Sequence, residues 1–182
     1  MVTRYQCITV VAAVVLAALL SGCILVRTTE QRINLRNDGS GEAVLRLIDI
    51  RSDEQADSLV QRDFRIMMSS FDHEGIEDFE QNGRKISAKR LFTRDDTLYA
   101  EISYTFNVTG AIEGLRMTHD ELYLVVNGGR EIARTNGRVE PWQNGTQRIV
   151  WKRDAQRLLF QIREKTLPPS TSLARLYDQF TR

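Results

Sequence analysis

Residues 98–108 read Leu-Tyr-Ala-Glu-Ile-Ser-Tyr-Thr-Phe-Asn-Val, and this stretch decides the fold class. Every second side chain from Leu98 to Val108 is apolar, and most of those between them are polar. Successive side chains of a strand point to opposite faces of a sheet, so a period of two predicts a strand with one buried face and one face in water.

Similar strand patterns, separated by short turn signals, lie on both sides of this stretch. Asn37-Asp-Gly-Ser-Gly41 is typical of a hairpin turn, because glycine adopts a positive φ without a steric penalty. We expect two further hairpins, one around Asn127-Gly-Gly129 and a last one around Arg153-Asp154. The expected strands cover residues 30–36, 42–50, 84–93, 121–126, 130–135, 147–152 and 156–163.

Helical signals follow the first hairpin and end the chain. Ser52-Asp-Glu-Gln55 has the form of a capping box and predicts a helix over residues 53–69. After Pro168-Pro169, Ser170 or Thr171 should cap a short helix. Hairpins predominate and strands do not alternate with helices. The predicted fold class is therefore α+β, an antiparallel β-sheet of hairpins with one helix after the first hairpin and a short C-terminal helix.

The N-terminus has the pattern of a secretory signal. Arg4 precedes an uncharged, mainly apolar run that ends in Leu20-Ser-Gly-Cys23. That tetrapeptide resembles the bacterial lipobox, in which the cysteine thiol receives a diacylglycerol, the peptide is cut before it and the new amine is acylated. The resemblance implies removal of residues 1–22 and lipidation of Cys23, with acyl groups such as palmitate. The alternative is an uncleaved membrane helix, because residues 7–26 carry no charge.

A lipid on Cys23 has consequences for the rest of the chain. The expected tether, residues 23–29, is very short, so a single α+β domain over residues 30–182 should lie close to the membrane. No free thiol would remain for catalysis, metal binding or a disulfide. Ile24 in place of aspartate after the cysteine favours the outer membrane, facing the periplasm, in a Gram-negative host. The 25 basic and 24 acidic side chains argue against a nucleic-acid partner.

The first part of the mature chain resembles uncharacterised bacterial lipoproteins in which a strand follows the lipidated cysteine almost at once. The matching pieces cover residues 23–117 and are Ile33-Asn-Leu35, Asp38-Gly-Ser-Gly41, Val44 to Ile50, the helix to Ser69, and Tyr104-Thr-Phe106 with Leu115. The resemblance implies an envelope lipoprotein and implies no catalytic residue.

Few motifs point to chemistry. The sequence lacks a nucleophile elbow, a phosphate-binding loop and a dinucleotide fingerprint. Its only two histidines lie beside carboxylates, His73 with Glu74 and His119 with Asp120. Brought together, they could bind zinc or another divalent ion, as in a metal-dependent hydrolase. Solvated loop histidines are the simpler interpretation, and we expect no catalytic residue, metal or other cofactor.

Aromatic side chains are the remaining candidates for binding. Tyr104, Phe106, Trp142 and Trp151 lie on or near expected strands, where they either fill the core or line an exposed surface. We expect a non-enzymatic binding or interaction module close to the membrane, with an envelope protein or lipid as partner. The alternative is a binder of lipids or small hydrophobic ligands, with a cleft formed by these aromatics and the methionine face of the first helix.

Overall fold

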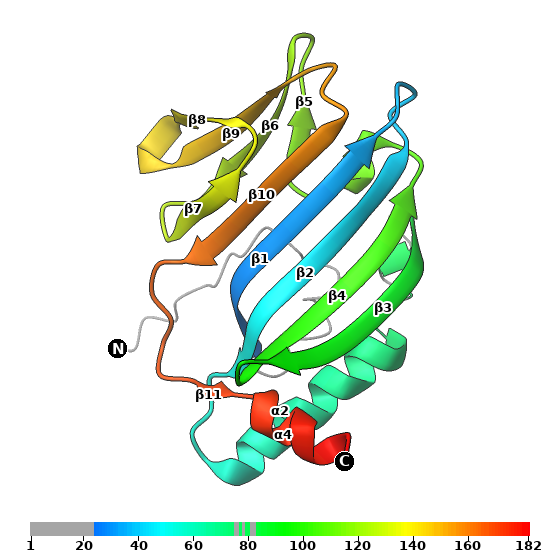
Figure 1. Cartoon of the computed structure of the whole chain (residues 1–182). Coiled ribbons are helices and arrows are strands. Elements are labelled where there is room, and N and C mark those ends of the chain that lie inside the picture. Colours follow the sequence, from blue (N-terminus) through cyan, green and yellow to red (C-terminus); the bar gives the residue numbers. More distant parts are fainter. Residues whose placement is uncertain (1–23, 75–76, 78, 81–82) are drawn as a thin grey trace, which may run out of the picture.

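Antiparallel sheets carry most of the chain in the computed structural model, which describes residues 24–74, 77, 79–80 and 83–182 (Figure 1). The larger, seven-stranded sheet has the order β3-β4-β2-β1-β10-β7, and β11 also pairs with β2. Its strands are β1 (Ile24–Leu35), β2 (Gly41–Ser52), β3 (Arg84–Arg94), β4 (Thr97–Phe106), β7 (Arg130–Thr135), β10 (Arg157–Glu164) and β11 (Thr171–Ser172).

The smaller, four-stranded sheet has the order β5-β6-β9-β8, and it lies over the β10 end of the larger sheet (Figure 1). Its strands are β5 (Leu115–Met117), β6 (Glu121–Val126), β8 (Arg138–Pro141) and β9 (Gln147–Lys152). The helices are α2 (Asp57–Ser69), which continues into a π-helical turn (Ser70–Glu74), and α4 (Ala174–Phe180), with 3-10 turns at Thr109–Ala111 and Gln143–Gly145. The predicted α+β class, with its helix after the first hairpin and its short C-terminal helix, is confirmed.

One face of the larger sheet supplies most of the core. The register places Leu45 beside Ile102 and Leu47 beside Ala100, and all four side chains are buried. The apolar side of α2 and the inner residues of the smaller sheet belong to the same cluster. Val108 is the exception to the predicted alternation, because β4 ends at Phe106 and leaves this side chain 56% exposed.

The opposite face of the larger sheet carries a row of alternating charges. The register aligns Glu30, Arg46, Glu101 and Arg90 across four strands. Arg46 forms ion pairs with both glutamates, and Arg90 lies 2.7 Å from Glu101. Each charge therefore has a neighbour of opposite sign. These ion pairs compensate charged groups that are partly buried on the solvent-facing side of the sheet.

The predictions of two later hairpins, around residues 127–129 and 153–154, are wrong. β6 pairs with β9 in the smaller sheet, whereas β7 pairs with β10 in the larger one. β9 and β10 likewise belong to different sheets, so the chain crosses from the smaller to the larger sheet at residues 127–129, returns at 136–137, and crosses again at 153–156. The Arg130 amide bonds the Asn127 carbonyl at 3.0 Å and closes a tight turn, but a tight turn does not determine which sheet receives the next strand.

The expected helix caps differ from those in the structure. Ser52 is the buried last residue of β2, where its hydroxyl donates to the Asp63 carboxylate at 2.6 Å. The helix therefore starts at Asp57, after Ala56, and not at residue 53. At the other end of the chain, Ser170 accepts a hydrogen bond from Arg51, and Ser172 accepts the Ala174 amide just before α4.

The first strand begins at Ile24, about six residues earlier than predicted. Ile24 is buried and pairs with Ser52, so the residues expected to form a tether belong to β1. The uncharged signal run continues through Val26, and this continuity hides the start of the strand in the sequence. Cys23 lies outside the described residues. Within the residues that are described, no helix has the length and apolar character to cross a bilayer.

Candidate functional site

The two histidine segments give no metal site in the described part of the chain. His119 lies in the turn between β5 and β6 with its side chain 97% exposed, and its Nε2 is 3.9 Å from a carboxylate oxygen of Asp120. The side chains of His73 and Glu74 lie outside the description. No group of three or more potential ligand side chains occurs among the described residues. A site that joins both histidines is only the remote alternative to solvated loop histidines, and it would involve side chains outside the described residues.

Three of the four candidate aromatics are buried. Tyr104 packs edge-on against Phe79, with ring centroids 4.9 Å apart, and its hydroxyl accepts a hydrogen bond from the Gln31 amide. Phe106 is buried beside it. Trp151 is buried between the sheets, where its indole N–H donates to Asn136 Oδ1 at 2.8 Å. These rings therefore fill the core and present no surface to a partner.

Burial also determines the ionisation of Tyr104. The loss of hydration, with a smaller contribution from Glu113, raises the pKa of its hydroxyl to about 12. The Arg84 guanidinium and the hydrogen bond from Gln31 act in the opposite direction but do not outweigh burial. Tyr104 is thus a neutral hydrogen-bond partner within the sheet, with no proton to exchange near neutral pH.

Trp142 is the candidate that lies on the surface. It is 36% exposed and directly precedes the 3-10 turn at Gln143–Gly145, where its backbone N–H bonds the Thr146 carbonyl at 2.9 Å. Asn144 adopts a left-handed conformation in this turn, with φ of 55°, which asparagine tolerates better than most residues. The turn therefore holds the indole ring over the outer face of the smaller sheet.

Arg148 on β9 joins this tryptophan to a second ring. Its guanidinium carbon lies 4.4 Å from the centroid of the Trp142 ring and 5.7 Å from that of Tyr123, and the two rings are 6.0 Å apart. We call the surface of Tyr123, Trp142 and Arg148 the Trp142 patch. Its side chains come from β6, from the turn after β8 and from β9.

Two glutamates fix the position of Arg148. Its guanidinium lies 2.6 Å from Glu121 and 2.7 Å from Glu140. Partial burial lowers the pKa of Arg148, but the two carboxylates raise it by more, so the net shift is upward. The two carboxylates compensate the charge of Arg148, and its guanidinium group lies over two rings. The arginine therefore supports a rigid aromatic surface. It is not available as a catalytic acid or as a free anion-binding group.

The patch has the composition of a protein-binding surface. Tryptophan, tyrosine and arginine dominate the binding energy of protein interfaces because they offer large contact areas with few rotatable bonds. Trp142 was a candidate from the sequence and Tyr123 lies on a predicted strand, whereas Arg148 was not predicted. Residues 147–152 carry three apolar side chains in a row and do not alternate, so the sequence gives only a weak signal for the outward position of Arg148.

In the described part of the chain, the hollow beside Trp151 combines apolar and charged lining. It has a volume of about 600 Å³, and charged side chains such as Glu121, Arg138 and Lys152 line much of it. Met67, which we considered for a cleft, is buried in the core. A buried methionine of this kind fills space between α2 and the sheet.

Comparisons with known proteins give no match. No protein-family model matches this sequence, and neither a curated protein nor a solved structure is similar to it.

Proposed function

We propose that this protein is a bacterial envelope lipoprotein, anchored by acyl chains on Cys23, whose domain is a non-catalytic binding module for another envelope protein. In a Gram-negative host it would face the periplasm from the outer membrane. The observation that carries the binding role is the Trp142 patch, in which the exposed Trp142 ring lies beside the half-buried Tyr123 ring and an arginine held between two carboxylates.

The anchor is supported by the position at which the fold begins. The lipobox-like Leu20-Ser-Gly-Cys23 directly precedes Ile24, and Ile24 is already paired in the sheet. A lipid on Cys23 would be one residue away from the folded domain. Acyl chains supply about 0.8 kcal/mol for each CH₂ group buried in the bilayer, so two or three chains give a stable anchor.

The alternative, a binder of lipids or small hydrophobic molecules, is the weaker proposal. It requires the candidate aromatics and the methionines of α2 to line an open cleft. Tyr104, Phe106, Trp151 and Met67 are instead buried against one another and against neighbouring core residues. Their packing leaves the Trp142 patch as the better supported binding surface.

The anchor is tested with Cys23→Ser in the native host. We expect the wild-type chain to fractionate with membranes and to release only into detergent. Mass spectrometry should give residues 23–182 plus acyl groups. The variant should lose the acyl mass and the cleavage before residue 23. A variant that is processed and membrane-bound like the wild type would contradict the lipid anchor.

The binding role is tested by photo-crosslinking in the same cells. A photoreactive amino acid at position 142 should form a discrete adduct with one envelope protein, and Arg148→Ala should reduce that adduct because it removes the support of the ring. The matched control is the same amino acid at Val108, an exposed apolar position in a different part of the molecule. Equal adducts from both positions, or none from position 142, would contradict the proposal.

A further inference from the structure

The beginning of β1 and the C-terminal helix lie at the same end of the larger sheet (Figure 1). Ile24 pairs with Ser52, and Ser52 pairs on its other side with Thr171. Neighbouring strands are about 4.8 Å apart, so Ile24 and Thr171 are separated by roughly 10 Å. Helix α4 begins three residues after Thr171. The residue that follows Cys23 is therefore close to α4.

The other end of the sheet is far from this point. β1 runs through 12 residues to Leu35 and continues into the turn at Asn37. At about 3.3 Å per residue, this strand places the turn roughly 40 Å from Ile24. A lipid attached to Cys23 would hold the α4 end against the bilayer and the turn end away from it.

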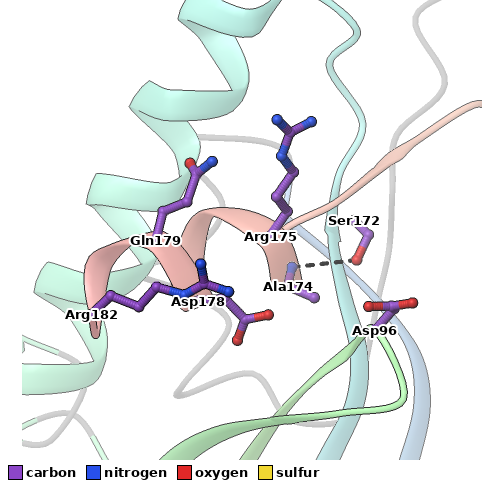
Figure 2. Close-up of a pocket in the computed structure, with 7 residues that line it drawn as sticks. All are labelled: Asp96, Ser172, Ala174, Arg175, Asp178, Gln179 and Arg182. Atoms are coloured by element: carbon purple, nitrogen blue, oxygen red, sulfur yellow. Dashed lines mark hydrogen bonds between the residues drawn. The ribbon is translucent and has the colours of Figure 1, made fainter.

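The surface of α4 has the side chains that an interfacial helix uses. Phe180, its last residue, is 66% exposed, although one edge of the ring meets Phe64 of α2 at a centroid distance of 6.0 Å. Arg175 and Arg182 are also exposed, and both line the hollow of Figure 2 together with Asp96 and Asp178. Neither arginine is in an ion pair with another side chain among the described residues. Phenylalanine lies favourably at the boundary of headgroups and acyl chains, and guanidinium groups bind phosphate oxygens in a bidentate manner.

The nearby acidic residues do not neutralise these arginines in the structure. Asp178 lines the same hollow, of about 430 Å³, but it accepts a hydrogen bond from the Thr93 hydroxyl and so is directed toward β3. Asp96 lies in the turn between β3 and β4 (Figure 2). Both guanidinium groups are therefore available to an anionic group from outside the chain.

We propose that Arg175, Phe180 and Arg182, which we call the α4 surface, lie against the headgroups of the bilayer that holds Cys23. The two guanidinium groups bind lipid phosphates, and the Phe180 ring inserts among the headgroups. This inference rests on the proposed lipid anchor. It adds that the domain has one fixed orientation on the membrane, with α4 toward the bilayer and the β1–β2 turn away from it.

The test measures which end of the anchored protein contacts lipid. Lipidated full-length protein is reconstituted in vesicles of phosphatidylethanolamine and phosphatidylglycerol that contain brominated lipids. After processing and lipidation the mature chain has no free thiol, so Phe180→Cys can carry a single fluorescent label. Asn37→Cys, exposed in the turn at the opposite end, is the matched control. Gln179→Cys, an exposed neighbour on α4, is a second labelling site should Phe180→Cys fail to fold.

We expect brominated lipid to quench the labels at positions 180 and 179 by at least about twofold, because interfacial side chains lie within ~10 Å of the acyl boundary. The label at position 37 should keep its intensity. Arg175→Glu with Arg182→Glu should reduce the quenching at position 180. Equal quenching at both ends, or none at position 180 in protein that floats with the vesicles, would overturn the inference.

Two further results would distinguish contact with a second copy of the chain, and failure of the lipid anchor, from contact of α4 with lipid. A label at position 180 that brominated lipid does not quench, and whose emission shifts only at high protein density, would identify a second copy of the chain as the occupant and overturn the inference. Protein that fails to float with vesicles at all would overturn the lipid anchor itself, and this inference with it.

Discussion

Glu101 accepts hydrogen bonds from arginines on two neighbouring strands. Its burial alone raises the pKa of the carboxyl group, but the bonds from Arg46 and Arg90 outweigh this effect, and the net pKa is lowered. A carboxyl group whose pKa is lowered by folding stabilises the folded state above its unfolded pKa. That stabilisation is lost as the pH falls through the folded pKa.

We predict that Glu101→Gln lowers the free energy of unfolding by about 1 kcal/mol near pH 7, since it removes charge-assisted hydrogen bonds from a row that is partly open to water. The difference from wild type should shrink as the pH falls below the ordinary value of 4.5. Urea denaturation at a series of pH values measures both effects. Glu131→Gln, in a half-exposed ion pair with Arg163, is the control and should change little. Parallel curves for Glu101→Gln and wild type would contradict the assignment.

The buried hydroxyl of Tyr104 accepts a hydrogen bond from the Gln31 amide. We predict that Tyr104→Phe lowers the free energy of unfolding by about 1–2 kcal/mol, because the buried Gln31 amide loses its acceptor. Thermal unfolding measures this change. Crosslinking from position 142 should be unaffected. A loss of the crosslink in a variant that remains folded would show that Tyr104 does contribute to binding.

At the scale of the residue, the sequence predicts which positions are aromatic but not which rings are exposed. Trp142 and Trp151 lie near each other in the chain, and both follow turn signals. One is on the surface and the other is in the core because Trp151 faces Phe160 of the other sheet, with ring centroids 6.2 Å apart. That contact exists only after two distant strands have been placed in two different sheets, so local patterns could not predict it.

At the scale of the element, the first hairpin requires glycine at position 41, because any side chain there would clash with its neighbours. A Cβ atom at Gly41 would lie 2.2 Å from the Asn34 carbonyl oxygen and 2.6 Å from the Phe106 ring. We predict that Gly41→Ala destabilises the domain by roughly 3 kcal/mol through overpacking between β1, β2 and β4. Gly129→Ala is the matched control, because a Cβ atom there meets nothing within 4 Å. Chemical denaturation of the two variants compares them, and equal stabilities would contradict this explanation.

Eight of the eleven strands in the described residues were predictable, whereas the short strands β5, β8 and β11 and two of the connections were not. The period of two in β4 and the Asp-Gly turn after β1 depend on neighbours in sequence, and both features are present in the structure. The pairings of β6 with β9 and of β7 with β10 depend on contacts between distant strands. A short glycine-rich turn permits a hairpin and a crossing between sheets equally well, and the choice belongs to the packing of the whole core.

At the scale of the whole molecule, the proposed lipid on Cys23 would be attached without a flexible tether, because β1 starts at Ile24. We predict that a flexible Gly/Ser linker of about ten residues between Cys23 and Ile24 leaves the domain folded and membrane-bound but allows it to rotate freely. Quenching of the label at position 180 and crosslinking from position 142 should both fall, while membrane fractionation stays the same. As a control, the same linker can be placed after Arg182, at the opposite terminus. A linker after Cys23 that leaves quenching and crosslinking unchanged would contradict a fixed orientation.

The start of the sheet directly after residue 23 also determines how the domain resists mechanical unfolding. A pull on the N-terminal end of β1 acts along the strand, and β1 is held by β2 on one side and by β10 on the other. Antiparallel hydrogen bonds run perpendicular to the strands, so such a pull shears both ladders at once and does not open them one bond at a time. Forced unfolding depends on the unfolding rate, and this arrangement slows it. A partner held at the Trp142 patch could therefore be pulled against the membrane with little risk that the domain unravels.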